Sequence, residues 1–150
     1  MNSYVLVSGD FVPWGGMDRA NYELARYLAE EVQANVHLVA YHVASPLAEH
    51  PHVTWHKVKK PFNKYLLAEP LLRRTGREVA RRLGTKEARV IVNGGNCAWS
   101  DVNWIHAAHC AWERRDRHAP ALFRWRAAWT KQWARHNELA ALAMARVVIT

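Results

Sequence analysis

Two adjacent glycines stand where an apolar run gives way to a helical pattern, and they are the first candidates for chemistry. Gly15 and Gly16 lie between the apolar residues 4–7 and the amphipathic residues 18–31. A helix start exposes unpaired N–H groups at the positive end of the helix dipole. Glycine also lets a phosphate or a sugar approach the backbone closely. The spacing matches neither GxGxxG nor a lysine-containing phosphate loop, so it indicates either a ligand-binding loop or a tight turn that simply requires glycine.

Two histidines, His106 and His109, follow a short apolar pair at the end of a predicted strand. An imidazole can donate or accept a proton near neutral pH, and α/β proteins bind ligands at the carboxyl ends of parallel strands. His106 could equally be a hydrogen-bonded structural residue. Cys97 and Cys110 lie nearby, but the four residues form no CxxC pair and have no usual zinc spacing. We therefore expect no bound metal.

A third candidate is a basic, tryptophan-rich segment in the last third of the chain. Six of the eight tryptophans lie between Trp99 and Trp133. A helix opening at Pro120 would carry an apolar stripe and several basic residues: Leu122, Trp125, Trp129 and Trp133, then Arg124, Arg126, Lys131 and Arg135. The simplest interpretation is that the stripe packs in the core and the charges face water. The alternatives are a helix lying on an anionic membrane and, least expected, a nucleic-acid grip.

The elements that must position these residues alternate between strand-like and helix-like patterns. Strands are predicted at 4–7, 36–41, 53–58, 89–93, 101–106 and 147–149. The runs at 4–7 and 147–149 are continuously apolar, which is typical of strands buried on both faces, whereas 53–58 alternates. Helices are predicted at 18–31, from Pro70 to a cap at Gly84, and from Pro120 onward. Residues 59–69 are expected to be a connection. The alternation predicts a parallel, doubly wound α/β sheet in one domain over residues 1–150.

Composition narrows the class of protein. The chain has 150 residues, 50% of them hydrophobic and 23% charged, with a net charge of +8. This excludes collagen-like, low-complexity and disulfide-scaffold proteins. No apolar run reaches the roughly 18 residues of a membrane span, and the N-terminus has no secretory leader pattern. Two cysteines and no leader indicate a cytoplasmic protein, and the basic balance favours anionic partners.

Three stretches together resemble a known family. The stretches are VLVSGDFVPWGGMDRANYELARYLAEE with the following VHLVAY, then VIVNGGNCAWSDVNWIHAAHCAW, and finally RVVIT. They resemble the N-terminal domain of a family 4 glycosyltransferase with the GT-B fold, in which two Rossmann-like domains face a cleft. The resemblance covers almost the whole sequence.

The resemblance implies roles for particular residues. Gly15 and Gly16 match the loop whose backbone meets the diphosphate of a nucleotide-sugar donor. His106 matches the histidine near the reacting sugar, with His109 as the second candidate. Trp14 and Asn93 are assigned to acceptor binding. The implied reaction is sugar transfer with retention, without a metal, and with the nucleotide-diphosphate sugar as co-substrate rather than a cofactor.

The resemblance also sets expectations about partners. The acceptor is expected to be a carbohydrate or a lipid-linked molecule, and an anionic membrane surface on the cytoplasmic side is a candidate partner. The donor-binding C-terminal domain of such enzymes is not in these 150 residues, so this part alone is expected to be inactive. The competing hypothesis is a non-catalytic α/β module that binds a nucleotide or phosphate on the same glycine loop. A basic nucleic-acid-binding protein is a weaker rival.

Overall fold

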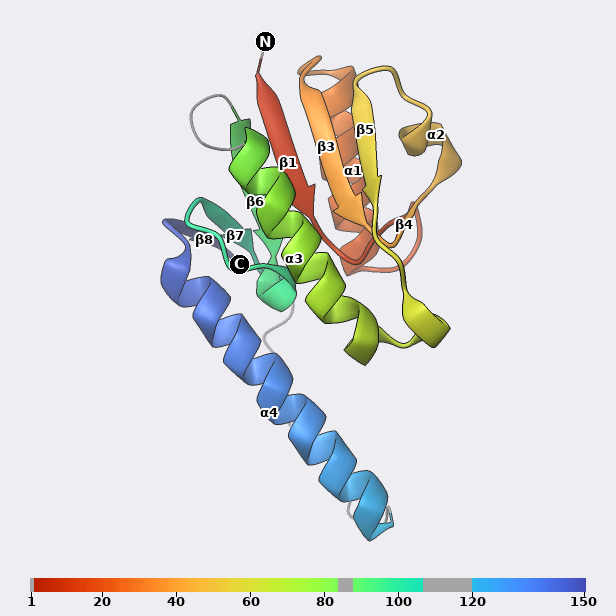
Figure 1. Cartoon of the computed structure of the whole chain (residues 1–150). Helices are drawn as coiled ribbons and strands as arrows, with labels where there is room; N and C mark the ends of the chain where they lie inside the picture. Colours follow the sequence, from red (N-terminus) through yellow and green to blue (C-terminus); the bar gives the residue numbers. More distant parts are fainter. Residues whose placement is uncertain (1, 84–87, 107–119) are drawn as a thin grey trace.

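The computed structural model describes residues 2–83, 88–106 and 120–150. Within them, six parallel strands form one sheet (Figure 1). From one edge to the other they are β5 (Val53–Lys57), β3 (Asn35–Ala40), β1 (Ser3–Val7), β6 (Ala88–Asn93), β7 (Val102–Trp104) and β8 (Val147–Ile149). This order, with helices on both faces, confirms the predicted doubly wound, Rossmann-like α/β fold.

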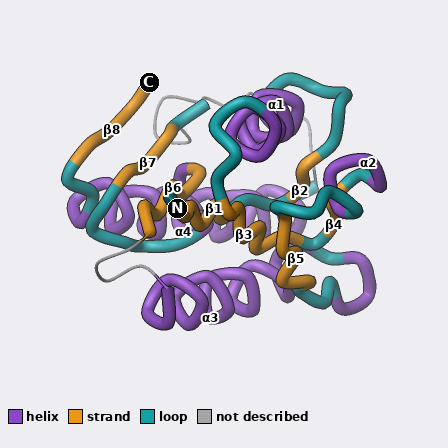
Figure 2. Tube along the Cα trace, turned by 90° about the horizontal axis from the view of Figure 1, so that it is seen from above, coloured by secondary structure: helices purple, strands orange, loops and turns teal. Residues whose placement is uncertain are grey.

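The core consists of two apolar layers, one on each face of the sheet. Successive side chains of a strand point to opposite faces, so Val5 and Val7 of β1 join one layer while Leu6 joins the other. Helix α3 (Tyr65–Leu83) closes the first layer and helix α1 (Met17–Glu30) closes the second. Figure 2 shows the sheet between these two helices. Because both faces are covered, the central strands β1 and β6 have consecutive apolar residues over most of their length.

Helix α1 begins where the two glycines end. The N–H of Ala20 donates to the carbonyl of Gly16 at 3.2 Å, which is the first turn of the helix. Its buried face is formed by Asn21, Tyr22, Ala25, Leu28 and Ala29. The predicted helical spacing included Tyr27, but that ring is exposed, so the face that packs on the sheet is rotated from the predicted one.

Helix α3 differs from the prediction at its start. Pro70 was expected to open the helix, but it lies inside it, because the helix begins at Tyr65. Ala68, which precedes the proline, is fully buried against the sheet. The packing of this turn outweighs the loss of the one backbone hydrogen bond that proline cannot donate. The predicted connection over residues 59–69 is therefore partly helical, and the predicted cap Gly84 lies outside the described residues.

Helix α4 (Ala121–Met144) follows Pro120 as predicted, but its tryptophan stripe is not in the core. Trp125 is 69% exposed and Trp129 is 50% exposed. The N-terminal half of the helix extends beyond the sheet (Figure 1), so the sheet offers it nothing to pack against. Burial is confined to the other half, at Asn137, Glu138 and Ala141. No helix within the described ranges is both long and apolar enough to cross a bilayer.

Strand β8 also departs from the prediction of a buried strand. All three of its side chains are exposed, although its backbone pairs with β7. It is an edge strand, so it has a neighbouring strand on only one side. The apolar sequence of residues 147–149 correctly predicted a strand, but the prediction that this strand is buried is wrong.

Several short elements were not predicted. Strands β2 (Asp10–Phe11) and β4 (His42–Val43) pair in parallel beyond the ends of β1 and β3. Helix α2 (Ser45–Ala48) follows β4, and two 3-10 turns, η1 (Pro61–Asn63) and η2 (Gly94–Asn96), precede α3 and follow β6. Two- to four-residue elements carry too little hydrophobic periodicity to be read from a sequence.

Candidate functional site

The strand order places a crevice at the carboxyl ends of β1 and β6. From β1 the chain proceeds through α1 to β3 on one side, whereas β6 leads to β7 on the other side. The segments that leave the two neighbouring strands therefore diverge, and doubly wound proteins bind their ligands at such a point. The glycine loop singled out from the sequence, which follows β1, begins here.

A cavity of about 330 Å³ lies at this point. It is bordered by residues after β1 and β6, by the start of α1 and α3, and by one residue of α4. They are Ser8, Gly9, Asp10, Met17, Asp18, Tyr41, Tyr65, Glu69, Asn93, Gly94, Gly95, Asn96 and Ala134. Its size is at the lower end of the range for small-molecule sites.

A buried polar junction forms one side of the cavity. The Oγ of Ser8 accepts hydrogen bonds from the Nδ2 of Asn21 at 3.0 Å and from the Nδ2 of Asn93 at 3.4 Å. All three side chains are almost fully buried. They join the ends of β1 and β6 to α1, and buried polar groups of this kind fix geometry because leaving one unpaired is costly. The amide of Asn93 is thereby held at the cavity wall.

Carboxylates and phenols form another part of the wall. Asp10 and Asp18 come from the β1–α1 segment, and Glu69 comes from α3. Burial, and then the charge of Asp10, raise the pKa of Asp18, while nearby His106 lowers it. Burial also raises the pKa of Tyr41 far above its ordinary value, with a further contribution from Glu69. Tyr41 therefore stays a neutral phenol at physiological pH.

Glu69 is held by a network that links α3, η2 and α4. Arg73 donates from Nη2 to the Oε1 of Glu69 at 2.9 Å and to the carbonyl of Gly95 at 3.1 Å. It also donates from Nη1 to the Oδ1 of Asn137 at 2.6 Å. The Nδ2 of Asn137 in turn donates to Glu69 at 3.2 Å. Three elements that are distant in sequence therefore fix one side of the cavity together.

His106 stands just beyond the carboxyl end of β7, near Asp18. Its ring packs on Trp104, with ring centroids 4.3 Å apart. Its Nε2 is buried and has no hydrogen-bond partner among the described residues. Burial lowers the pKa of His106 and the charge of Asp18 opposes this effect. A neutral imidazole with an unsatisfied ring nitrogen can donate to or accept from one ligand group.

Asn103 supports the same region from β7. Its Nδ2 donates to the carbonyl of Gly94 at 3.0 Å, which fixes the turn after β6. Its Oδ1 is buried and has no partner within the described ranges. An unpaired acceptor in the core is rare in proteins.

The predicted site residues do not all lie at the cavity. Asn93 lines the cavity. Gly15 and Gly16 lie at the exposed start of α1, immediately before the lining residue Met17, and they are not part of the lining. Trp14 is 64% exposed beside them. His109 lies outside the described residues.

The two glycines differ in why they are needed. Gly15 has φ +83°, a conformation that side-chain-bearing residues rarely adopt. Gly16 has φ −85°, so its backbone does not require glycine. A Cβ atom at either position would meet no other atom within 4 Å. The loop is therefore open to an approaching ligand.

Some site residues were not singled out from the sequence. Ser8 and Asp10 directly follow the first apolar run, so their position at a strand end was a usable signal. Tyr41 likewise follows β3. Glu69 offered no such signal, because it lies in a segment predicted to be a connection. Only the packing of α3 brings Glu69 to the cavity.

The polar side chains that line the cavity can form hydrogen bonds with hydroxyl groups. Carboxylates and amide oxygens accept hydrogen bonds from hydroxyl groups, and amide NH₂ and phenol groups donate to them. Within the described residues, no three His, Cys, Asp or Glu side chains gather in a way that could hold a metal ion. The three carboxylates disfavour a phosphate inside the cavity, although the open start of α1 beside it suits one.

Comparisons with protein-family models, with curated proteins and with solved structures find no match to this chain. Its function is therefore inferred from its own residues and their arrangement.

Proposed function

We propose that the chain is the N-terminal half of a retaining GT-B glycosyltransferase and that its cavity binds the hydroxyl groups of a sugar. The observation that carries the proposal is the position and lining of the cavity. It lies at the switch point between β1 and β6 and is lined by carboxylate, amide and phenol groups. The resemblance of the sequence to family 4 glycosyltransferases supports the same function.

The lining suits a neutral, hydroxyl-rich group better than an anion. Asp10, Asp18 and Glu69 can each accept hydrogen bonds from hydroxyls, and they repel phosphate. The amide of Asn93 has a fixed position because it bonds to Ser8. Fixed groups lose little entropy on binding, which favours selective recognition of a sugar.

We place the charged diphosphate of the donor outside the cavity, at the glycine loop before α1. In the reaction, the bond between the anomeric carbon and the diphosphate oxygen breaks, a bond to an acceptor oxygen forms, and the proton of the acceptor hydroxyl passes to the leaving diphosphate. Negative charge builds up on the leaving diphosphate. The exposed N–H groups at Gly15, Gly16 and the start of α1 can stabilise that charge without moving.

His106 is proposed to bond to the reacting sugar or the acceptor. Its Nε2 is buried without a partner among the described residues and its pKa is lowered, so a ligand group that reached it would meet a neutral ring. Trp14 is exposed next to the glycine loop and can pack on an apolar part of the acceptor, which is a carbohydrate or a lipid-linked molecule in this proposal. No metal is assigned a role.

The test is a glycosyl-transfer assay on the full-length protein. A panel of nucleoside-diphosphate sugars is incubated with the protein and candidate acceptors, and release of the free nucleoside diphosphate is measured. We expect release with at least one donor. His106→Ala should lower the rate by at least about tenfold without changing the melting temperature. The matched control is His42→Ala, since His42 is exposed on β4.

Each outcome of the assay decides between functions. Release that depends on His106 but not on His42 supports the transferase. Binding of nucleoside diphosphates without turnover of any donor supports the non-catalytic nucleotide- or phosphate-binding module instead. Unfolding of His106→Ala, together with unchanged turnover in His106→Gln, would assign the histidine a structural role and contradict its proposed place in the reaction.

A further inference from the structure

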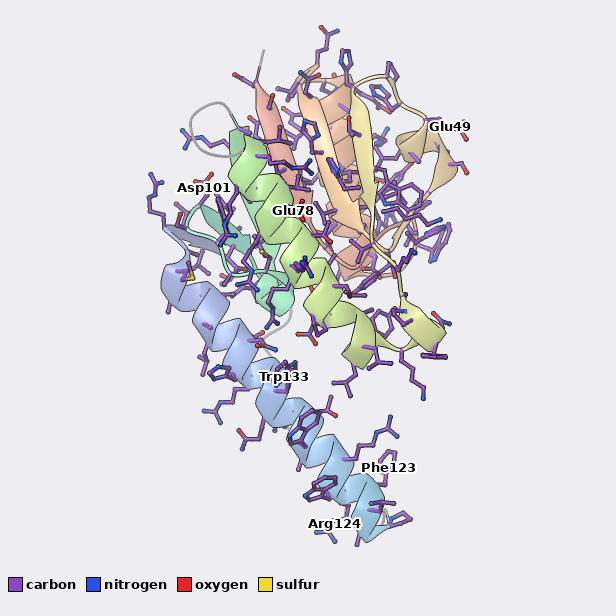
Figure 3. The ribbon with its side chains drawn as sticks, in the orientation of Figure 1. Glu49, Glu78, Asp101, Phe123, Arg124 and Trp133 are labelled. Carbon is purple, nitrogen blue, oxygen red and sulfur yellow. The ribbon has the colours of Figure 1, made fainter. Side chains whose placement is uncertain are left out.

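The N-terminal half of α4 is a largely exposed helix that projects beyond the sheet. From Pro120 to His136 almost every residue is exposed, and burial begins only at Asn137. The helix projects away from the sheet, and Figure 3 places Phe123 and Arg124 at its far end. An exposed aromatic surface of this kind marks an interaction site in a soluble protein.

Two chemically different faces run along this half of the helix. Spacings of three and four residues place Leu122, Trp125, Trp129 and Trp133 on one stripe. Trp129 and Trp133 are stacked, with ring centroids 6.0 Å apart. A separate set of residues, Arg124, Lys131 and Arg135, falls about half a turn away from that stripe.

The charge of this half of the helix has one sign. Residues 121–136 contain four basic residues and no acidic residue. The segment therefore has no carboxylate of its own that could neutralise the positive charge of these four side chains. A positively charged surface with exposed indole rings is complementary to a partner surface that has negative charge outside and an apolar layer beneath it.

We propose that this half of α4 lies flat on an anionic lipid bilayer. In this arrangement the stripe of Leu122 and the three tryptophans enters the boundary between headgroups and acyl chains, where indole rings are favoured. Arg124, Lys131 and Arg135 stay on the opposite, polar face and reach anionic headgroups with their long side chains, while Arg126 lies beside the stripe. The C-terminal half of the helix keeps the domain attached through Asn137.

Two other occupants fit the same surface less well. A second copy would bring an equally basic helix against this one, and like charges facing each other oppose association. A single-stranded nucleic acid needs stacking rings and phosphate-binding cations along one groove. Here Trp125 and Trp129 lie on the side opposite Lys131.

The test is flotation of the purified full-length protein with lipid vesicles. Vesicles of phosphatidylcholine with phosphatidylglycerol are compared with vesicles of phosphatidylcholine alone, at low and high sodium chloride. We expect binding to the anionic vesicles at low salt, weakened by high salt. Trp125→Ala/Trp129→Ala should reduce the partition coefficient roughly tenfold or more. Arg124→Gln/Lys131→Gln should reduce it by about fivefold for each charge removed.

Matched controls separate this helix from the rest of the surface. Tyr27→Ala removes an exposed aromatic ring from α1, and Arg81→Gln removes an exposed charge from the equally basic α3. Both should bind vesicles like the unmodified protein. Circular dichroism melting checks that each variant remains folded. Because the vesicles contain neither nucleotide sugar nor glycosyl acceptor, the result does not depend on the proposed transferase activity.

Three results would overturn the proposal. The first is an unmodified protein that does not float with anionic vesicles at low salt. The second is equal flotation of the tryptophan variant and Tyr27→Ala. The third is a protein that does not bind vesicles but either dimerises in analytical ultracentrifugation or binds a single-stranded oligonucleotide, in a way that depends on the tryptophans. Dimerisation would assign the surface to a second copy, and oligonucleotide binding would assign it to nucleic acid.

Discussion

The guanidinium of Arg73 in α3 donates a 2.6 Å hydrogen bond to the side-chain oxygen of Asn137 in α4. The same guanidinium pairs with Glu69 and caps the carbonyl of Gly95. One side chain thus joins two helices and the turn after β6 at the edge of the cavity. The exposed half of α4 ends immediately before this junction, so Arg73 also fixes the base of the proposed membrane helix.

Removing this arginine should destabilise the domain. Arg73→Ala leaves the largely buried carboxylate of Glu69 without its cation and leaves Gly95 without its donor. We expect a loss of about 2–3 kcal/mol in the free energy of unfolding, measured by urea denaturation. Arg74→Ala, one residue away on the exposed side of α3, is the control and should change stability by less than about 0.5 kcal/mol. Equal stability of the two variants would show that the network contributes little.

Gly16→Val tests the glycine loop as a diphosphate site. The backbone angles at Gly16 suit any residue, and a Cβ there meets nothing within 4 Å, so the fold should tolerate valine. The branched side chain would stand where a diphosphate must approach the N–H groups of α1. In the full-length protein we expect at least about a tenfold loss of transfer with an unchanged melting curve. Full activity in this variant would place the diphosphate elsewhere.

Gly76 is required by close packing of α3 on β1. A Cβ at this position would lie 2.9 Å from the Cγ1 of Val7, a stiff side chain in the core. Gly76→Ala should therefore cost about 1–3 kcal/mol, despite the better helix propensity of alanine. The double variant Val7→Ala/Gly76→Ala should be more stable than the sum of the two single changes predicts, since the added methyl fills the space left at Val7. Strict additivity in urea denaturation would contradict this contact.

Acid should destabilise the domain through a pair of histidines. The Nδ1 of His37 and the Nε2 of His56 lie 3.3 Å apart across β3 and β5. Burial lowers the pKa of both rings, and the neighbouring charges of His37 and Arg82 lower that of His56 further. The unfolded chain therefore takes up protons before the native protein does. The stability present above pH about 6.5 should fall as the pH drops through that value.

The measurement for this pair is the free energy of unfolding as a function of pH. His37→Gln/His56→Gln should have a shallower decline below pH about 6.5 than the unmodified protein. His42→Gln changes an exposed histidine and should leave the decline unchanged. A double variant that follows the unmodified curve would mean that other groups cause the acid sensitivity.

The sequence by itself determined the sheet and most of its helices. Runs such as residues 4–7 and 90–92 are apolar throughout, which is typical of a strand covered on both faces. The alternation of strands and helices then allows few topologies, because parallel crossovers are right-handed. The resemblance to a known family, not a pattern of residues, assigned Asn93 a binding role, and the structure places this residue at the cavity wall.

Tertiary structure alone decided which residues meet and which faces are covered. Glu69 and Arg73 reach Gly95 and Asn137 only through the packing of α3, since no local pattern encodes contacts across 64 residues. The stripe of α4 has the periodicity of a buried helix, yet it is exposed. Periodicity reports that a helix has an apolar face, but burial depends on whether another element lies opposite that face. The sequence of a single helix does not contain that information.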